Sequence, residues 1–174
     1  MGGGAGRGGR AGRPGGGAGL SELLQMIEAA CPGSTVLEAE HRGERTVEVR
    51  RERVLEVARH LRGAGYVMLS DLTCADFPEE EGRFRLSYVL FSMESATRLR
   101  LRVWAGADDP EVESVVSVWP TANWHEREVF DMFGVRFRNH PDLCRILMPL
   151  DWEGHPLRRD YPIGGEAVQF TDAV

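Results

Sequence analysis

The chain has 174 residues, of which 42% are hydrophobic, and its formal net charge is −6 at pH 7. This length and composition predict one domain with one core. The negative charge argues against nucleic acid as the main partner, because neutralising phosphates needs a basic surface. No stretch approaches the ~18 consecutive apolar residues of a transmembrane helix.

The three cysteines, Cys31, Cys74 and Cys144, are far apart in the sequence. None belongs to a CxxC pair, so the spacing indicates neither a zinc ribbon nor an iron–sulfur ligand set. Each is interpreted as a buried, inert thiol. An odd number of scattered cysteines is typical of a reducing, cytosolic environment.

Residues 1–19 are mostly glycine, with three arginines and no acidic residue. Such a segment cannot offset its ordering entropy, so we expect a disordered arm. It lacks the apolar run of a secretory signal. Contact of its arginines with RNA or anionic lipid is the alternative to a plain flexible arm.

Residues 20–134 are expected to form an α+β core domain. Stretches with helical spacing of apolar residues are interleaved with stretches that have strand patterns. This order predicts a mixed, mostly antiparallel sheet with helices packed on it. In chain order we expect a helix from near Leu20 to Cys31, strands Val36–Glu40 and Thr46–Val49, a helix Arg51–Arg62, strands Tyr66–Asp76, 84–90 and 99–103, and an irregular or helical turn over Val112–Val118.

A further helix is predicted over Ala122–Phe133, ended by Gly134 in a left-handed cap. At about 100° per residue, an apolar stripe including Val129 and Phe133 faces the core. The opposite side of this helix carries polar residues and one aromatic residue, which are Trp124, Arg127, Glu128 and Asp131.

Glu126 is unusual because its helical angle places a carboxylate on the apolar side. An unpaired buried charge costs several kcal/mol, so Glu126 needs a partner. One interpretation is a capping box with Asn123 at the start of the helix. The other is an ion pair with an arginine of the following segment, such as Arg136, Arg138 or Arg145.

Residues 135–174 are expected to form an extended, irregular C-terminal tail that binds a partner. Prolines at 141, 149, 156 and 162 exclude a continuous helix or a central strand. Apolar residues such as Leu147, Leu150 and Trp152 make the segment too hydrophobic for a free, disordered end. A long segment of this kind is normally functional, and its aromatic residues and arginines are those that interface centres favour.

The stretch NWHEREVFDMFGVRFRNHPDLCRILMPLDWEGHPLRRDYP closely resembles the signature of the C subunit of proton-pumping NADH–quinone oxidoreductase, the 30-kDa subunit family of respiratory complex I. The resemblance implies a non-catalytic structural and docking subunit of the peripheral arm. It further implies packing on the D subunit, which helps to form the quinone site, with the B and I subunits nearby. FMN, the iron–sulfur clusters, NADH and quinone would all be bound by partner subunits. Membrane association would be indirect, at the cytoplasmic face of the inner (plasma) membrane.

The resemblance implies no catalytic, cofactor-binding or metal-binding residue in this chain. Its functional residues would instead form ion pairs, within the chain or across to the D subunit, and a partner interface. The candidate residues are Trp124, Glu126, Arg127, Glu128, Asp131, Phe133, His140, Arg145, Asp151, Trp152, His155, Arg158, Arg159, Asp160 and Tyr161.

Two alternatives remain open from the sequence. One is a homologous component of a membrane-bound hydrogenase, or of another cofactor-dependent quinone-reducing dehydrogenase. The other is a metal-dependent hydrolase, because the main helix and the tail contain several side chains that could bind a metal. The helical angles of His125 and Asp131 diverge, however, and no HExxH pair is present. The possible ligands are His125, Glu126, Glu128, Asp131, His140 and His155.

Overall fold

The computed structural model describes residues 20–41 and 44–162, so the predicted arm at 1–19 and the last twelve residues lie outside the described part. The helices and strands include all the predicted ones, in the expected order. They are α1 (Leu20–Ala30), β1 (Thr35–His41), β2 (Glu44–Val49), the 3-10 helix η1 (Arg51–Arg53), α2 (Val54–Gly63), β3 (Met68–Asp76), β4 (Phe84–Ser92), β5 (Thr97–Ala105), β6 (Glu111–Glu113), α3 (Ala122–Phe133) and β7 (Arg136–Arg138).

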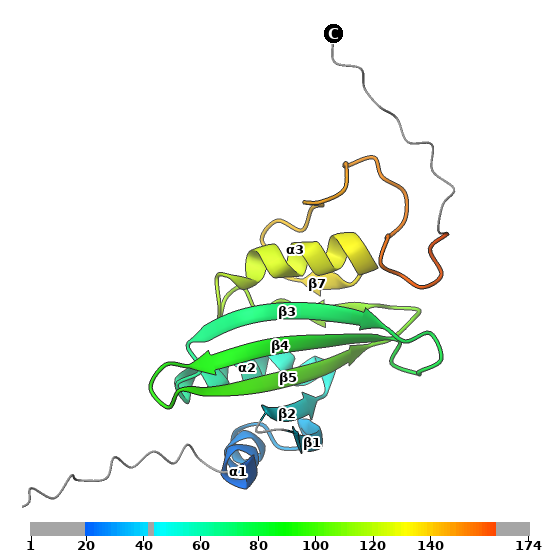
Figure 1. Cartoon of the computed structure of the whole chain (residues 1–174). Helices are drawn as coiled ribbons and strands as arrows, with labels where there is room; N and C mark the ends of the chain where they lie inside the picture. Colours follow the sequence, from blue (N-terminus) through cyan, green and yellow to red (C-terminus); the bar gives the residue numbers. More distant parts are fainter. Residues whose placement is uncertain (1–19, 42–43, 163–174) are drawn as a thin grey trace, which may run out of the picture.

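Five strands form the main sheet, in the order β1-β2-β5-β4-β3 (Figure 1). The β2–β5 pair is parallel and the other three pairs are antiparallel. The predicted α+β class with a mixed, mostly antiparallel sheet is therefore confirmed. Along β4 every second residue is buried, as the alternation of apolar side chains predicts for a strand with one face on a core.

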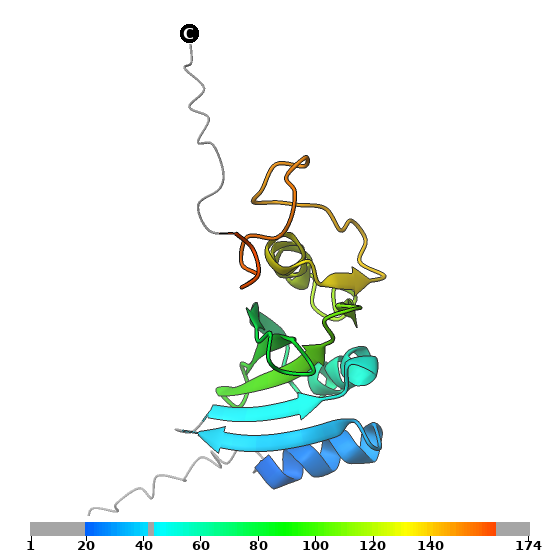
Figure 2. The same cartoon turned by 90° about the vertical axis from the view of Figure 1, so that its right-hand side faces the viewer.

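The core lies between the sheet and the helices, of which α2 runs behind β3, β4 and β5 in Figure 1. Val57 and Leu61 of α2 are fully buried, as are Leu86 and Leu101 of the sheet. Figure 2 shows the N-terminal α1 at the end of the molecule opposite α3. Among the described residues, no helix is both long and apolar enough to cross a membrane.

A second, two-stranded sheet pairs β6 with β7 in parallel, which local patterns did not predict. Val135 and Phe137 are buried, and the core therefore continues past Gly134, where the core domain was expected to end. The irregular part of the C-terminal region starts at residue 139. We call residues 139–162 the tail. In Figures 1 and 2 it loops around α3, as the orange and red trace shows.

Candidate functional site

The tail supplies hydrogen-bond donors to the end of α3. The last four carbonyls of any helix lack partners within the helix. Here Gly134, in the left-handed conformation predicted for it (φ 74°), caps one of them, and the tail takes the other three. The bonds are Gly134 N to Phe130 O (2.9 Å), His155 Nδ1 to Asp131 O (2.9 Å), Leu157 N to Met132 O (3.0 Å) and Arg158 Nε to Phe133 O (2.6 Å).

Asp131 is the central residue of this α3–tail contact. Its Oδ1 accepts a bond from Arg145 Nη1 at 2.6 Å, and its Oδ2 accepts the backbone N–H groups of residues 146–148 at 2.8–3.0 Å. Arg145 also donates to the carbonyl of Gly154. Burial alone would raise the pKa of Asp131, but these donors outweigh it and lower the pKa, so the carboxylate stays ionised.

The helical angle of Asp131 placed it on the side opposite the core-facing stripe, but the structure buries it completely. The reason is that the tail folds over this side of α3 and covers it. Trp124 and Glu128, predicted on the same side, remain exposed. The helical spacing of apolar residues therefore predicted the core-facing stripe of α3 correctly. It did not predict the second face of α3, which the tail buries.

Arg127 makes a second contact between α3 and the tail. Its guanidinium donates to the carbonyl of Cys144 at 3.1 Å and lies 2.9 Å from the Sγ atom of the same residue. The guanidinium also stacks over the ring of Trp124 at 5.1 Å. Arg127 therefore holds the start of the tail against the helix, and its charge meets no carboxylate among the described residues.

Glu126 has neither of the two partners expected from the sequence. Its side chain is fully buried and accepts bonds from Ser114 Oγ and Val115 N, both at 2.7 Å. The N-cap residue is Thr121, without a side-chain cap bond, so the capping box with Asn123 is wrong. The arginine pair is also wrong: Arg145 bonds Asp131, and Arg136 and Arg138 pair with carboxylates beside and within β6.

His140 lies next to Glu126 and connects it with the tail. Its Nε2 is 3.2 Å from the carbonyl of Asn123 and 4.0 Å from Glu126 Oε2. Its Nδ1 accepts the N–H of Asp142, so the neutral ring carries its proton on Nε2. Burial lowers the pKa of His140 and raises that of Glu126 to about 7. Both effects favour the uncharged forms of these two buried side chains.

We expect Glu126→Gln to remove a pH dependence of stability. The raised pKa means that the folded state binds the proton more tightly than the unfolded state. The corresponding stability is present below about pH 4.5 and is lost as pH rises through about 7, in total about 3 kcal/mol. Glutamine can accept a hydrogen bond from Val115 N and donate one to Ser114 Oγ. The free energy of unfolding of the variant should therefore increase relative to that of the wild type as pH rises.

Denaturant unfolding of both proteins between pH 4.5 and 8 measures this difference. Glu128→Gln, on the exposed side of the same helix, serves as the control and should follow wild type throughout. Parallel stability curves for Glu126→Gln and wild type would show that Glu126 does not take up a proton on folding.

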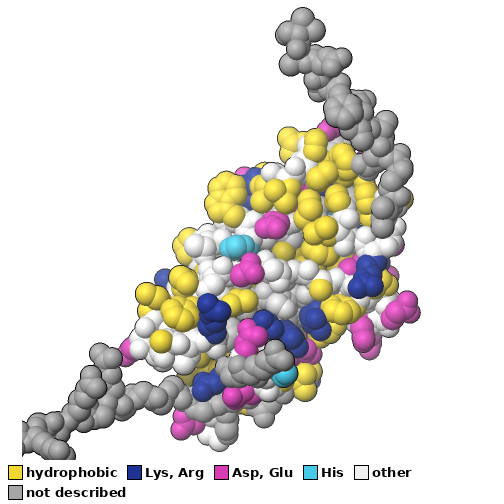
Figure 3. All heavy atoms as spheres, in the orientation of Figure 1, with side chains coloured by type: hydrophobic (Ala, Val, Ile, Leu, Met, Phe, Trp, Pro, Cys, Tyr) yellow, Lys and Arg dark blue, Asp and Glu magenta, His cyan; other side chains and the backbone are white. Residues whose placement is uncertain are grey.

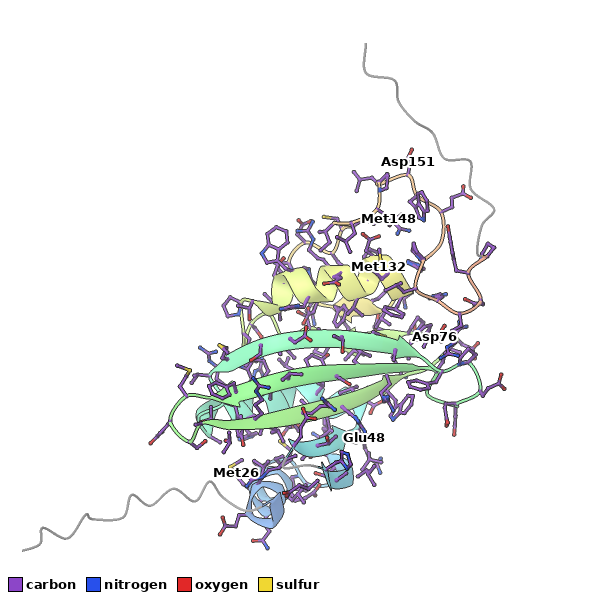
Figure 4. All side chains as sticks on the ribbon, viewed as in Figure 1. Met26, Glu48, Asp76, Met132, Met148 and Asp151 are labelled. Carbon is purple, nitrogen blue, oxygen red and sulfur yellow. The ribbon has the colours of Figure 1, made fainter. Side chains whose placement is uncertain are left out.

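The end of the tail returns to the main sheet at the end of β3. Asp76 Oδ2 accepts the N–H of Arg159 at 2.8 Å, and both oxygens of Asp76 hold Arg83. Arg83 also pairs with Asp160 at 2.7 Å. The bonds from Arg83 lower the pKa of Asp76. Figure 4 shows Asp76 where the last residues of the tail approach β3. Asp76 and Arg83 were not predicted as site residues, because no local pattern relates them to the tail.

The remaining predicted site residues differ in their surroundings. Phe133 is buried in the core, and the ring of Tyr161 packs over Gly154. Trp152 is half-buried, and its Nε1 is buried without a hydrogen-bond partner among the described residues. Glu128 and Asp151 are exposed, and neither side chain has a hydrogen bond or ion pair with a described residue. Figure 4 places Asp151 at the outermost turn of the tail.

Polar groups of the tail bind inward, whereas several of its apolar side chains point outward. Leu147, Leu150 and Leu157 are 59%, 81% and 54% exposed, and Trp124 of α3 is 64% exposed. We call these four residues the docking face. Figure 3 shows hydrophobic side chains gathered over the part of the molecule that holds α3 and the tail. Leu157 also borders a groove of about 170 Å³ between β3 and α3.

The histidines of α3 and the tail do not gather into one metal site. His125 is 3.9 Å from Asp71, His140 faces Asn123 and Glu126, and His155 bonds the carbonyl of Asp131. In the described part of the chain, these three rings and the nearby carboxylates form no common ligand set. This arrangement gives no support to the hydrolase alternative.

Comparison with known proteins gives concordant results. The family model for the 30-kDa subunit of respiratory-chain NADH dehydrogenase matches residues 47–167. The C subunit of NADH-quinone oxidoreductase from Roseiflexus sp. (strain RS-1) is 46% identical over 152 residues, which cover 86% of this chain and 87% of that protein. The corresponding C subunit from Geobacter sulfurreducens is 48% identical over 128 residues, covering 72% of this chain and 79% of that protein.

Two solved structures share the fold. A trypsin-resistant fragment of Nqo5 is 31% identical and superposes with a TM-score of 0.63, covering 71% of this chain and 98% of that one. A chain of the membrane-bound sulfane sulfur reductase, an archaeal respiratory membrane complex, superposes with a TM-score of 0.64 over 82% of this chain and 85% of that one. Its identity of 22% supports likeness of fold alone.

Proposed function

This chain belongs to the 30-kDa subunit family of respiratory-chain NADH dehydrogenase, and we propose that it is a non-catalytic docking subunit of the peripheral arm of a proton-translocating NADH:quinone oxidoreductase. In this proposal the docking face packs on the D subunit, which helps to form the quinone site, with the B and I subunits nearby. The role of the chain is to assemble and stabilise the electron-transfer module.

One observation supports this proposal most directly: the tail is fixed to its own chain by polar contacts and exposes its apolar residues. The backbone N–H groups of residues 146–148 all bind Asp131. Leu147 and Leu150 nevertheless remain more than half exposed. Exposing these side chains to water is unfavourable, and a contiguous apolar surface normally marks a site of association. A partner with a matching apolar surface would cover them without disturbing the α3–tail contact.

The proposal assigns FMN, the iron–sulfur clusters, NADH and quinone to partner subunits. The buried titratable side chains around α3 support this assignment, because Glu126, Asp131 and His140 are each engaged in a structural contact. Asp131 and Arg145 neutralise each other, and Glu126 and His140 face each other as buried side chains.

We also propose that the chain lies at the cytoplasmic face of the membrane and associates with it only through the complex.

The docking face can be tested by placing a charge on it. We expect Leu150→Glu, combined with Leu157→Glu, to reduce copurification of the D subunit at least about tenfold, because an unpaired charge buried at an interface costs several kcal/mol. Met93→Glu is the matched control, because Met93 is 68% exposed but follows β4, away from the tail. Tagged variants purified from solubilised membranes, with the copurifying chains identified, give the measurement.

Equal recovery of the D subunit with the double variant and with Met93→Glu would contradict the proposed interface. The same purification distinguishes the related complexes. A nickel-bearing hydrogenase chain in place of the D subunit would overturn the NADH:quinone assignment in favour of a homologous membrane-bound complex.

A further inference from the structure

A group of potential metal ligands lies between α1 and α2, at the end of the molecule away from the docking face. The Sγ atom of Cys31, a carboxylate oxygen of Glu56 and a ring nitrogen of His60 all lie within 4.8 Å of one another. We propose that these three side chains form a binding site for a zinc ion, with water as the fourth ligand. Cys31 precedes the family-matched residues 47–167, so the site joins this earlier segment to the matched domain.

The local structure explains why the three side chains meet. Glu56 and His60 are four residues apart on α2, a spacing that places both on one face of a helix. Cys31 follows the last residue of α1, and its N–H bonds the carbonyl of Ile27. The turn after Cys31 is held by Glu28, whose two oxygens accept the N–H groups of Gly33 and Thr35. The thiol is thereby fixed against the face of α2.

The chemistry of the donor set fits zinc. Zinc binds thiolate, imidazole and carboxylate, and sites with three protein ligands keep a fourth position for water. Cys31 is buried, Glu56 is half-buried and His60 is exposed, so the open side of the cluster faces solvent. A thiolate and one carboxylate together balance the double positive charge of the ion. The softer sulfur ligand disfavours magnesium and calcium, which select oxygen.

The geometry needs only small side-chain adjustments. In a tetrahedral zinc site, bond lengths of 2.0–2.3 Å place the ligand atoms roughly 3.3–3.8 Å apart. Rotation of the longer Glu56 and His60 side chains about their own bonds can close the remaining gap. Arg53 already bonds Glu56 Oε2 at 2.7 Å and so helps to hold this carboxylate in place. Partners of this kind orient a metal-binding carboxylate.

Cobalt is a suitable probe, because Co²⁺ replaces Zn²⁺ and is coloured when tetrahedral. We expect the full-length chain to bind Co²⁺ with a thiolate-to-cobalt charge-transfer band that added Zn²⁺ abolishes. Cys31→Ser should lose the band, and His60→Gln should weaken zinc binding by about tenfold or more. Zn²⁺ should also raise the thermal unfolding midpoint of the wild type more than that of His60→Gln.

Two variants serve as controls. Cys74→Ser and His41→Gln remove a thiol and an exposed histidine outside the cluster, and both should bind like the wild type. His60 is exposed, so His60→Gln remains informative if Cys31→Ser fails to fold. Absence of the charge-transfer band in the wild type, or unchanged zinc affinity in His60→Gln, would overturn the proposal.

Discussion

Replacing Asp131 with alanine is expected to lower the free energy of unfolding by about 3–5 kcal/mol and to release the tail from α3. The substitution leaves Arg145 without its carboxylate and three backbone N–H groups without an acceptor. Each donor that stays buried without a partner costs about 1–3 kcal/mol, so separation of the tail from the helix is the less costly outcome. Because the docking face is carried mainly by the tail, the proposed association with the D subunit should be lost as well.

Denaturant unfolding gives the stability change, and amide hydrogen exchange at residues 146–148 reports the release of the tail. Glu128→Ala is the matched control, because Glu128 lies on the same helix, is exposed and has no bond with a described residue. It should change stability by less than about 0.5 kcal/mol. Protected amides at 146–148 in Asp131→Ala would contradict the role given to this carboxylate.

Gly134→Ala is expected to cost about 2–5 kcal/mol through two separate effects. Gly134 has a φ of 74°, and the left-handed region costs a residue with a Cβ about 1–2 kcal/mol. A Cβ at this position would also lie 2.5 Å from His155 Nε2 and 2.6 Å from Arg158 Nη2. Both side chains cap carbonyls of α3, so moving them loosens the α3–tail contact and adds a cost typical of overpacking, about 1–3 kcal/mol.

Gly33→Ala separates these two effects. Gly33 has nearly the same φ, 70°, but a Cβ there would meet no atom within 4 Å. Gly33→Ala should therefore show only the conformational cost of about 1–2 kcal/mol. The additional loss of unfolding free energy in Gly134→Ala measures the steric conflict with the tail. Equal losses in the two variants would show that the tail can move aside from a Cβ at residue 134 without weakening its contacts.

Asp131→Ala and Gly134→Ala test whether the residues that carry the family resemblance have a structural or a chemical role. The stretch that carries it contains Asp131, Gly134, Arg145, His155 and Arg158. In the structure all five meet at the end of α3, and their bonds hold the tail in position. These contacts therefore hold the apolar residues of the tail in place, as the proposed docking role requires.

Patterns within the sequence were sufficient for the α+β class and for the order of the helices and main strands. Apolar spacing along α2, β4 and β5 reports directly which face of each element is buried, because the spacing follows from the local period. Gly134 was recognisable as the cap of α3 because it directly follows the helical pattern and glycine readily adopts the left-handed conformation. The proline-rich tail was recognisable because neither the helical nor the strand spacing of apolar residues continues into it.

Only the tertiary structure decided which hydrogen-bond partners the tail and the buried carboxylates have. Arg145 reaches Asp131 across 14 residues, and the N–H of Arg159 reaches Asp76 across 83. Glu126 bonds Ser114 and Val115, which precede α3, although local rules pointed to Asn123 or to an arginine. Such choices depend on which donors lie nearby once the chain has folded. A period along the sequence describes one element at a time and carries no information about a segment that folds back over it.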